Sequence, residues 1–213
     1  MIDRARAWHL LTALVVAIAL VLQTVLVVEG SAVLAEEDPP GLALRLGRLV
    51  SYFTIQSNLL VLVAAVTLVR HPQQEGRAWR VLRLAGIAGI AVTGVVHFVL
   101  LRPLLDLEGA SWVADKLLHM VVPVLALVGW LVFGPRPRID WVDVGRALVW
   151  PFGWLAWTLV VGGATGWYPY PFLDVDEEGW ARVLGSCIGI TVLFLAVVAG
   201  FADLDRRFRR TSG

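Results

Sequence analysis

Six long stretches of apolar residues follow one another along the chain, separated by shorter segments that carry most of the charge. Each stretch has roughly the 20 apolar residues that a helix needs to cross the hydrocarbon core of a bilayer. The pattern therefore predicts a single domain over residues 1–213, an all-α integral membrane protein built as a six-transmembrane-helix bundle. The expected helices cover residues 8–28, 47–69, 81–101, 112–133, 145–163 and 181–202.

Three small polar side chains interrupt the second apolar stretch. Thr54, Ser57 and Asn58 are spaced i, i+3 and i+4, so a helix places them on one stripe. Hydrogen-bonding groups cost free energy in hydrocarbon unless they are paired. The stripe is therefore expected to face the bundle interior or a wet cavity.

The fourth stretch carries an acid and a histidine one helical turn apart. Asp115 and His119 are spaced i, i+4, so the carboxylate can accept a hydrogen bond from one imidazole nitrogen while the other faces the bundle. Pro123 lacks an N–H, so the helix is expected to kink near His119. Counted from the outer ends of their helices, Thr54 and His119 both lie about 10 Å deep. A hydroxyl, an imidazole and an acid at one level are the parts of a nucleophile, base and orienter system.

The composition indicates lipid as the surrounding solvent. Of the 213 residues, 58% are hydrophobic and 16% are charged, which is more apolar surface than a soluble core of this size buries. The net charge is +1 and no basic cluster is interleaved with aromatic residues, so nucleic acid is not an expected partner. The single cysteine, Cys187, has no internal disulfide partner.

The basic residues are divided unevenly between the two ends of the predicted helices. Six spans place both chain ends on one side, together with the loops that return to that side. Thirteen of the 18 basic residues fall there: Arg4, Arg6, Arg70, Arg77, Arg80, Arg83, Arg136, Arg138, Arg146, Arg206, Arg207, Arg209 and Arg210. Because basic residues gather on the cytoplasmic side, we expect a multi-pass plasma membrane protein with both termini cytoplasmic and the 164–180 loop outside.

The N-terminus also has features of a cleaved secretory signal. Arg4 and Arg6 precede an apolar run, and Val33, Leu34 and Ala35 stand before Glu36 in the manner of a cleavage site. The apolar run is longer than a typical signal core, which favours a retained first helix.

Several further side chains are candidates to support the site. His97, on the third stretch, is expected to make a packing or substrate contact. Ser57 and Asn58 lie one turn deeper than Thr54 and could donate to an oxyanion, and the alternative for Asn58 is an interhelical hydrogen bond. Candidate substrate anchors lie near the outer ends of the helices: Arg45, Arg48, Arg102, Arg182, Tyr168 and Tyr170.

The outer loop is rich in proline and aromatic residues. Pro169 and Pro171 are expected to extend residues 168–172, so that the loop folds over the mouth of the bundle as a partial lid. The alternative is an interfacial anchor that never touches a substrate.

These residues carry a resemblance to a known family. The Phe53-Thr54 to Ser57-Asn58 and Leu118-His119 to Pro123 segments, on the second and fourth of six helices, resemble the androgen-induced-protein family of membrane hydrolases and its bacterial six-helix relatives. The resemblance implies a threonine hydrolase of fatty acid esters of hydroxy fatty acids, with Thr54 as nucleophile and His119 as the family histidine. The 164–180 loop looks like the bacterial branch, which leaves the substrate open.

Read from the residues alone, the chemistry is acyl transfer. His119 would take the Thr54 proton as the threonine oxygen attacks an ester carbonyl, and Asp115, from its spacing, would orient His119. The expected partners are membrane lipids and a lipid ester substrate, and no metal or cofactor is expected.

Three alternatives stay open. A bis-histidine haem-binding electron carrier would use His97 and His119 as axial ligands. A zinc hydrolase would need these two with Asp115, although Asp115 is better placed behind His119. A non-enzymatic membrane scaffold or transporter would use the polar stripe only to join helices.

Overall fold

The computed structural model describes residues 3–31, 40–134 and 139–211. Within these ranges the chain is helical apart from short connections, and it forms no strand. The helices are α1 (Arg4–Val28), α2 (Leu42–Ser51), α3 (Phe53–Arg70), α4 (Arg77–Val96), α5 (Gly109–Lys116), α6 (Val122–Val128), α7 (Trp141–Thr165) and α8 (Val175–Thr211). Three π-helical turns (His97–Leu101, Leu117–Val121, Gly129–Phe133) and two 3₁₀ turns (Arg102–Leu104, Pro171–Leu173) complete the described elements.

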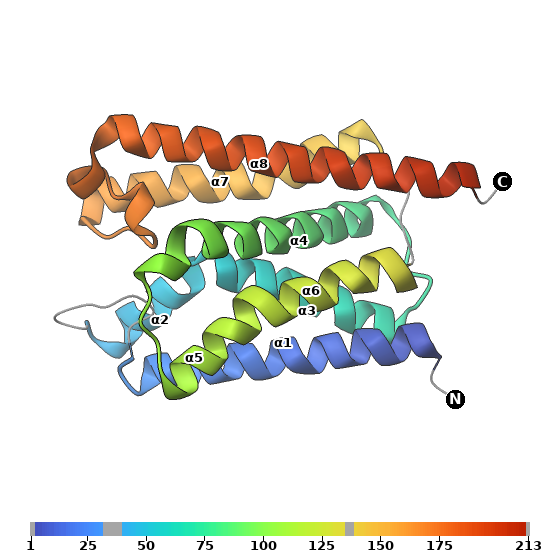
Figure 1. The fold of residues 1–213 in the computed structure, drawn as a ribbon, viewed down its shortest axis with the longest axis horizontal. Coiled ribbons are helices and arrows are strands. Elements are labelled where there is room, and N and C mark those ends of the chain that lie inside the picture. The colour runs from blue at the N-terminus through green and yellow to red at the C-terminus, as the bar shows by residue number, and fades with distance from the viewer. Residues whose placement is uncertain (1–2, 32–39, 135–138, 212–213) are drawn as a thin grey trace.

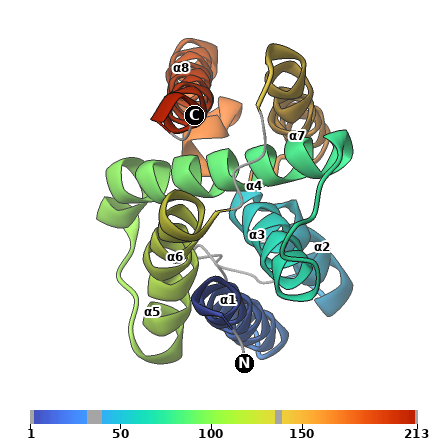
Figure 2. The same cartoon turned by 90° about the vertical axis from the view of Figure 1, so that its right-hand side faces the viewer.

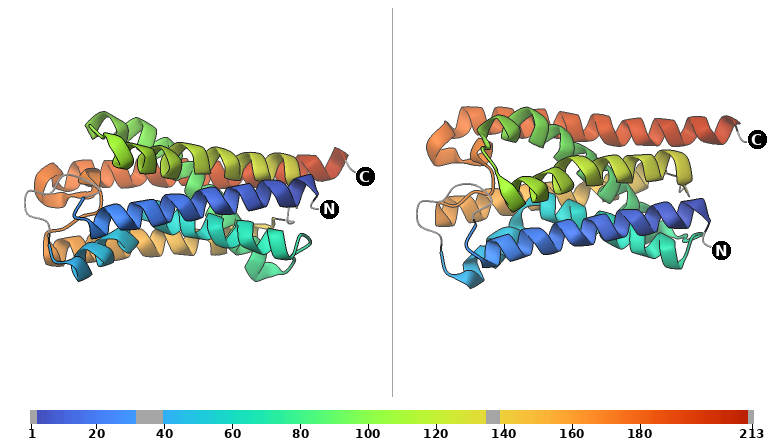
Figure 3. Two further views of the ribbon diagram at one scale, coloured as in Figure 1. Left: turned by 90° about the horizontal axis from the view of Figure 1, so that it is seen from below. Right: turned by 60° about the horizontal axis from the view of Figure 1, so that its bottom comes forward.

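Six helical runs are long and apolar enough to cross a membrane, which confirms the predicted all-helical class and the six long apolar helices. They are Arg4–Val28, Phe53–Arg70, Arg77–Leu104, Gly109–Phe133, Trp141–Thr165 and Val175–Phe208. The runs lie roughly side by side, and the start of α1 and the end of α8 are at the same end of the bundle (Figures 1 and 3).

Helix α4 is the centre of the bundle. It lies between α1, α3, α5 and α6 on one side and α7 and α8 on the other (Figure 2), and 61% of the most apolar part of its run is buried, against 17% in α7. Glycines allow close packing on its surface, because a Cβ atom at Gly89 would lie 2.8 Å from the Trp150 ring and 3.2 Å from Ser57 Oγ.

The second predicted span is wrong at its start. Instead of one helix from residue 47, the chain forms α2 and α3, separated at Tyr52, whose backbone is extended (φ −66°, ψ 130°). The break leaves carbonyl groups without helical partners, and side chains satisfy two of them: Trp154 Nε1 donates to the Ser51 carbonyl at 2.8 Å and Gln56 Nε2 to the Val50 carbonyl at 3.0 Å. One contact from α7 and one from α3 itself therefore stabilise an interruption that the apolar pattern does not predict.

Other predicted helix ends differ by several residues for local reasons. Helix α7 begins at Trp141 because the Asp140 and Asp143 side chains form a capping box with each other's backbone N–H groups. Helix α8 has non-helical backbone at Gly179 (φ 75°), so its long straight part begins near the predicted start. The signal-cleavage triplet of residues 33–35, and Arg136 and Arg138 of the charge count, lie outside the described residues.

Candidate functional site

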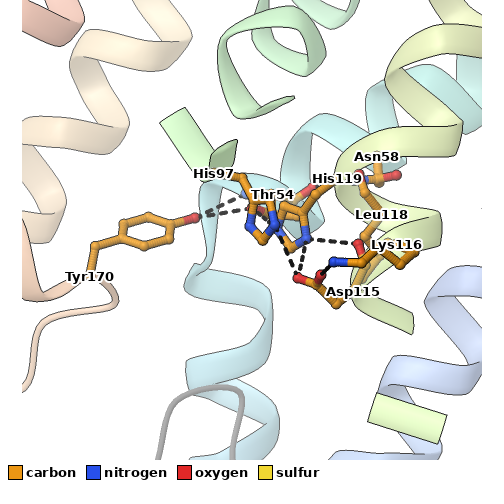
Figure 4. A network of polar contacts seen from close by, with 8 residues as sticks. All are labelled: Thr54, Asn58, His97, Asp115, Lys116, Leu118, His119 and Tyr170. Atoms are coloured by element: carbon orange, nitrogen blue, oxygen red, sulfur yellow. Dashed lines mark hydrogen bonds and ion pairs between the residues drawn. The ribbon is translucent and has the colours of Figure 1, made fainter. Parts of the chain in front are cut away.

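Thr54 and His119, which are 65 positions apart in sequence, are in hydrogen-bond contact. Thr54 Oγ1 lies 3.2 Å from His119 Nε2 (Figure 4). His119 Nδ1 in turn lies 3.0 Å from both Asp115 Oδ1 and the Asp115 carbonyl oxygen. The hydroxyl, imidazole and carboxylate that the sequence singled out therefore form one connected chain.

The partners of His119 determine which ring nitrogen carries the proton. Both groups near Nδ1 belong to Asp115 and can only accept a hydrogen bond, so the proton of the neutral imidazole lies on Nδ1. Nε2 is then the acceptor and faces the Thr54 hydroxyl, which donates to it. This is the tautomer that a general base acting on Thr54 requires.

Two π-helical turns present the histidines to the site. His119 lies in the turn Leu117–Val121, and this turn ends two residues before Pro123. His97 begins the turn His97–Leu101, which ends two residues before Pro103. Proline has no N–H to complete the regular helical pattern, and wide turns of this kind occur frequently at functional sites. The kink expected at His119 is thus realised as a π-helical turn.

His97 and Lys116 complete the surroundings of Asp115. The His97 ring is 1% exposed and stacks on the His119 ring with 3.9 Å between centroids and 11° between planes. His97 Nε2 lies 3.4 Å from Asp115 Oδ1, while Lys116 Nζ lies 2.9 Å from Oδ2. His97 therefore packs on His119, one of the two contacts expected from the sequence, and Lys116 is a counter-ion for Asp115 that the spacing argument missed.

Tyr170 reaches Thr54 from the connection between α7 and α8. Its hydroxyl accepts a hydrogen bond from the Thr54 backbone N–H at 3.2 Å and lies 3.3 Å from Thr54 Oγ1 (Figure 4). Since the Thr54 hydroxyl donates to His119, the Tyr170 hydroxyl is the donor to Thr54 Oγ1. Burial raises the pKa of Tyr170 above that of an ordinary phenol, so the hydroxyl remains a donor at neutral pH.

The break at Tyr52 makes the Tyr170 contact available. Thr54 lies in the first turn of α3, where a backbone N–H has no partner in its own helix and the helix dipole is positive. Aromatic rings fix the phenol there: Tyr52 edge-on at 5.6 Å, Phe172 stacked at 5.2 Å and Trp154 tilted at 5.9 Å. Thr54 therefore lies at the N-terminus of α3. The depth that the sequence predicted for it, counted along a continuous helix from residue 47, does not apply.

Ser57 and Asn58 are buried on the same stripe as Thr54, but their donors are engaged elsewhere. Ser57 Oγ donates to the Phe53 carbonyl at 2.8 Å and accepts from Thr93 Oγ1 at 3.2 Å. Asn58 Nδ2 donates to the Thr54 carbonyl at 2.8 Å and, across the helix interface, to the Leu118 carbonyl at 3.3 Å. The geometry favours the helix-joining role of Asn58 over the oxyanion role.

The arginines proposed as substrate anchors have structural contacts. Arg45 Nη1 donates to the Val27 carbonyl at 2.9 Å and so caps the end of α1. The Arg48 guanidinium lies 4.9 Å from the centre of the Trp167 ring, and that of Arg102 lies 5.2 Å from the Phe98 ring. Arg182 pairs with Glu178 at 3.1 Å. None of the four lines the cavities beside Thr54 that the described residues form.

Tyr168, the other proposed anchor, holds the connection between α7 and α8 against α7. Its ring lies on Gly162, where a Cβ atom would overlap the ring. Gly162→Ala is therefore expected to displace the loop and to lower the free energy of unfolding by about 1–3 kcal/mol. The matched control is Gly163→Ala, because a Cβ there would meet only the Tyr168 hydroxyl at 4.0 Å. Thermal unfolding should show a loss for Gly162→Ala and none for Gly163→Ala; equal melting temperatures would contradict the contact.

Three side chains near Thr54 could in principle hold a metal ion or a haem. His97, Asp115 and His119 each offer one ligand atom, and these atoms lie within 4.8 Å of one another. Parallel stacking, however, keeps the imidazole lone pairs from converging on one ion, and the Lys116 ammonium already neutralises Asp115. Axial haem ligands must face each other across the iron, which stacked rings cannot do. The arrangement suits a hydrogen-bonded base better than either centre.

A cavity of about 60 Å³ opens beside the three residues. Thr54, His97, Asp115, His119 and Tyr170 line it, together with Gln23 of α1, Ser31 just after α1 and Ser111 of α5. The rest of its wall is formed by Tyr52, Ile55, Leu101, Leu105, Leu107 and Leu118. A polar cavity of this size has room for water beside His119.

Comparison of the chain with protein-family models, with curated proteins and with solved structures gave no match.

Proposed function

We propose that this protein is an intramembrane threonine hydrolase that cleaves a lipid ester. The observation that carries the proposal is the directed hydrogen-bond chain from the Tyr170 hydroxyl to Thr54 Oγ1, from Thr54 to His119 Nε2, and from His119 Nδ1 to Asp115. A nucleophile bonded to a base, which is itself oriented by a third group, is the arrangement of covalent acyl-transfer enzymes.

The proposed reaction has two halves. In the first, His119 Nε2 takes the proton of Thr54, the threonine oxygen bonds to the ester carbonyl carbon, and the alcohol leaves with the proton that His119 returns to it. In the second, a water molecule loses a proton to His119 and its oxygen attacks the acyl-threonine carbonyl; the Thr54 oxygen leaves with the proton that His119 returns to it, which releases the fatty acid and restores Thr54 and neutral His119. Asp115 holds the His119 ring and stabilises its charged form in both halves.

The positive end of α3 is the candidate oxyanion site. The backbone N–H of Thr54 has no partner within α3 and donates to the Tyr170 hydroxyl, which in turn donates to Thr54 Oγ1. An oxyanion that takes the place of the Tyr170 oxygen would accept this N–H at the positive end of α3, the role that the sequence interpretation gave to Ser57 and Asn58.

A lipid ester is the substrate class that suits this location. Thr54 lies in the first turn of α3, in a bundle of six helices long and apolar enough to cross a membrane, and α3 begins on the side away from the end where α1 starts and α8 finishes (Figure 1). An ester whose chains lie in the bilayer can present its carbonyl at that depth. The resemblance to hydrolases of fatty acid esters of hydroxy fatty acids points to the same class.

The proposal includes the orientation in the plasma membrane. The asymmetry of basic residues supports an orientation with both termini in the cytoplasm and the Tyr170 loop outside. A reporter fused after Gly213 is expected to be cytoplasmic, and one inserted among residues 176–178 is expected to be external. A cytoplasmic signal from the inserted reporter would contradict the six-span topology.

The acyl-threonine intermediate gives a direct test. Purified protein is incubated with a lipid ester, quenched in acid, and digested, and the peptide that contains Thr54 is expected to gain the mass of the acyl group. Thr54→Ala must not gain it, and His119→Ala should accumulate far less. An ester turned over with no adduct on Thr54 at any time, at a rate unchanged in Thr54→Ala, would refute the proposal.

A further inference from the structure

Two cavities meet at Thr54. One is the polar cavity beside His119, and the other, of about 80 Å³, lies on the far side of the Thr54 and Tyr170 side chains. Thr54, Leu101 and Tyr170 line both. The nucleophile thus stands at the boundary of two compartments rather than at the end of one.

The second cavity is almost wholly apolar. It lies between α4, α7 and α8, and aliphatic and aromatic side chains form most of its wall, among them Phe53, Val96, Leu148, Leu155, Ile190 and Phe194. Phe172 and Leu173, from the outer loop, close its outer end. An apolar cavity of this size favours an apolar occupant over ordered water.

The cavity reaches the surface that faces lipid. Helices α7 and α8 both pack on α4 and stand apart from each other (Figure 2), and the cavity lies between them. Phe152, one of its wall residues, is 43% exposed, and so lies at its rim. Cys187 and Thr191 of α8 line the cavity, whereas their neighbours Ile188 and Val192 point outward, 64% and 60% exposed.

The position of the base distinguishes the two compartments. The atom that leaves in the first half-reaction is the alcohol oxygen, and it must receive its proton from His119, which lines only the polar cavity. The alcohol portion therefore lies on the His119 side. The acyl carbon stays bonded to Thr54, and its chain must extend away from the leaving alcohol, toward the apolar cavity.

We propose that the apolar cavity between α4, α7 and α8 is the acyl-chain site and holds the first carbons of one unbranched aliphatic chain, whose remainder passes out at the rim beside Phe152, while the polar cavity receives the alcohol and water. The assignment of acyl against alcohol rests on the proposed hydrolase function; occupation of the cavity by an aliphatic chain does not. The site would set acyl-chain specificity and would hold the chain during hydrolysis of the acyl-threonine.

Filling the cavity tests the assignment. Cys187→Phe adds a ring inside it, and Ile188→Phe adds the same ring on the outward face of the same helix. We measure kcat/KM for a series of esters that share one alcohol and carry acyl groups from acetyl to palmitoyl, and for acetyl esters of alcohols of increasing size. Cys187→Phe is expected to lower kcat/KM for long acyl groups at least about tenfold, and to leave acetyl esters and the alcohol series unchanged. Ile188→Phe should match the wild type.

A second measurement does not depend on activity. Cys187 is the only cysteine in the chain, so its rate of alkylation by N-ethylmaleimide reports on the cavity. Palmitic acid is expected to slow alkylation of Cys187 several-fold, and not to slow that of Ile188→Cys in a Cys187→Ala background, which controls for effects of the fatty acid on the reagent or the membrane mimetic. A smaller replacement, Cys187→Leu, repeats the kinetic test if Cys187→Phe lowers the melting temperature.

The outcomes separate the two proposals. Protection of Cys187 in a protein without ester turnover would support the chain site and refute the hydrolase. Ester turnover without protection of Cys187 from alkylation would overturn the acyl-chain site and leave the hydrolase standing. In that case kcat/KM for the acyl series is unchanged in the Cys187 variants, or kcat/KM for the alcohol series changes instead. Neither turnover nor protection would overturn both.

Discussion

Thr54→Ala is expected to lower the rate of lipid ester hydrolysis by at least about a thousandfold, because it removes the hydroxyl that donates to His119 Nε2 at 3.2 Å. Thr54→Ser keeps a hydroxyl and should keep part of the turnover. His119→Ala should fall as far as Thr54→Ala, and the double variant little further, because the two side chains act as one unit. Initial rates on a panel of lipid esters and melting temperatures are measured on the same preparations.

Ser57→Ala is the matched control for Thr54→Ala. Ser57 is another buried hydroxyl on the same stripe of α3, but it donates to the Phe53 carbonyl rather than to a base. It should lose some stability and keep its turnover. If the polar stripe only joined helices, both variants would lose stability alike with no selective loss of activity. A stable and fully active Thr54→Ala protein would end the threonine-hydrolase proposal.

Asp115→Asn is expected to lower kcat by about a hundredfold with little change in KM, a smaller loss than that of Thr54→Ala. The carboxylate can only accept a hydrogen bond from His119 Nδ1, which keeps Nε2 free of a proton. An asparagine amide can donate as well, which admits the other tautomer. In that tautomer Nε2 carries the proton and cannot accept the proton of Thr54.

Lys116→Met controls for the loss of charge around Asp115. Lys116 contacts Oδ2, at 2.9 Å, whereas His119 contacts Oδ1. Its removal should lower the melting temperature and leave most of kcat, while Asp115→Asn lowers both. Wild-type kcat in Asp115→Asn would show that His119 does not depend on Asp115 for its orientation.

Local sequence rules are sufficient for the parts of the site that lie on one helix. The i, i+4 spacing of Asp115 and His119 predicts their contact, and Pro123 predicts the irregular turn between them. The common stripe of Thr54 and Asn58 likewise predicts that both are buried. Each of these predictions needs only the geometry of a helix and the cost of unpaired polar groups in an apolar setting.

The interruption at Tyr52 shows where such rules fail. The apolar run continues through it, so periodicity alone joins α2 to α3. The break is stabilised by the Trp154 indole on α7 and by ring contacts of Tyr52 with Trp167 and Tyr170, all more than a hundred positions away. Its consequence is chemical, because it places Thr54 at a helix N-terminus, where its backbone N–H has no partner in α3 and donates to Tyr170 instead.

The sequence by itself determined that this protein is a bundle of six long apolar helices, and it singled out Thr54, Asp115 and His119, because hydrocarbon makes every unpaired polar side chain conspicuous. Only the tertiary structure decided that Tyr170 hydrogen-bonds to Thr54, that the His97 ring stacks on His119, and that Thr54 lines both a polar cavity and an apolar one. Those features depend on how separate helices and the connection between α7 and α8 pack together, and helical spacing within one segment carries no information about which residues of another segment will meet it.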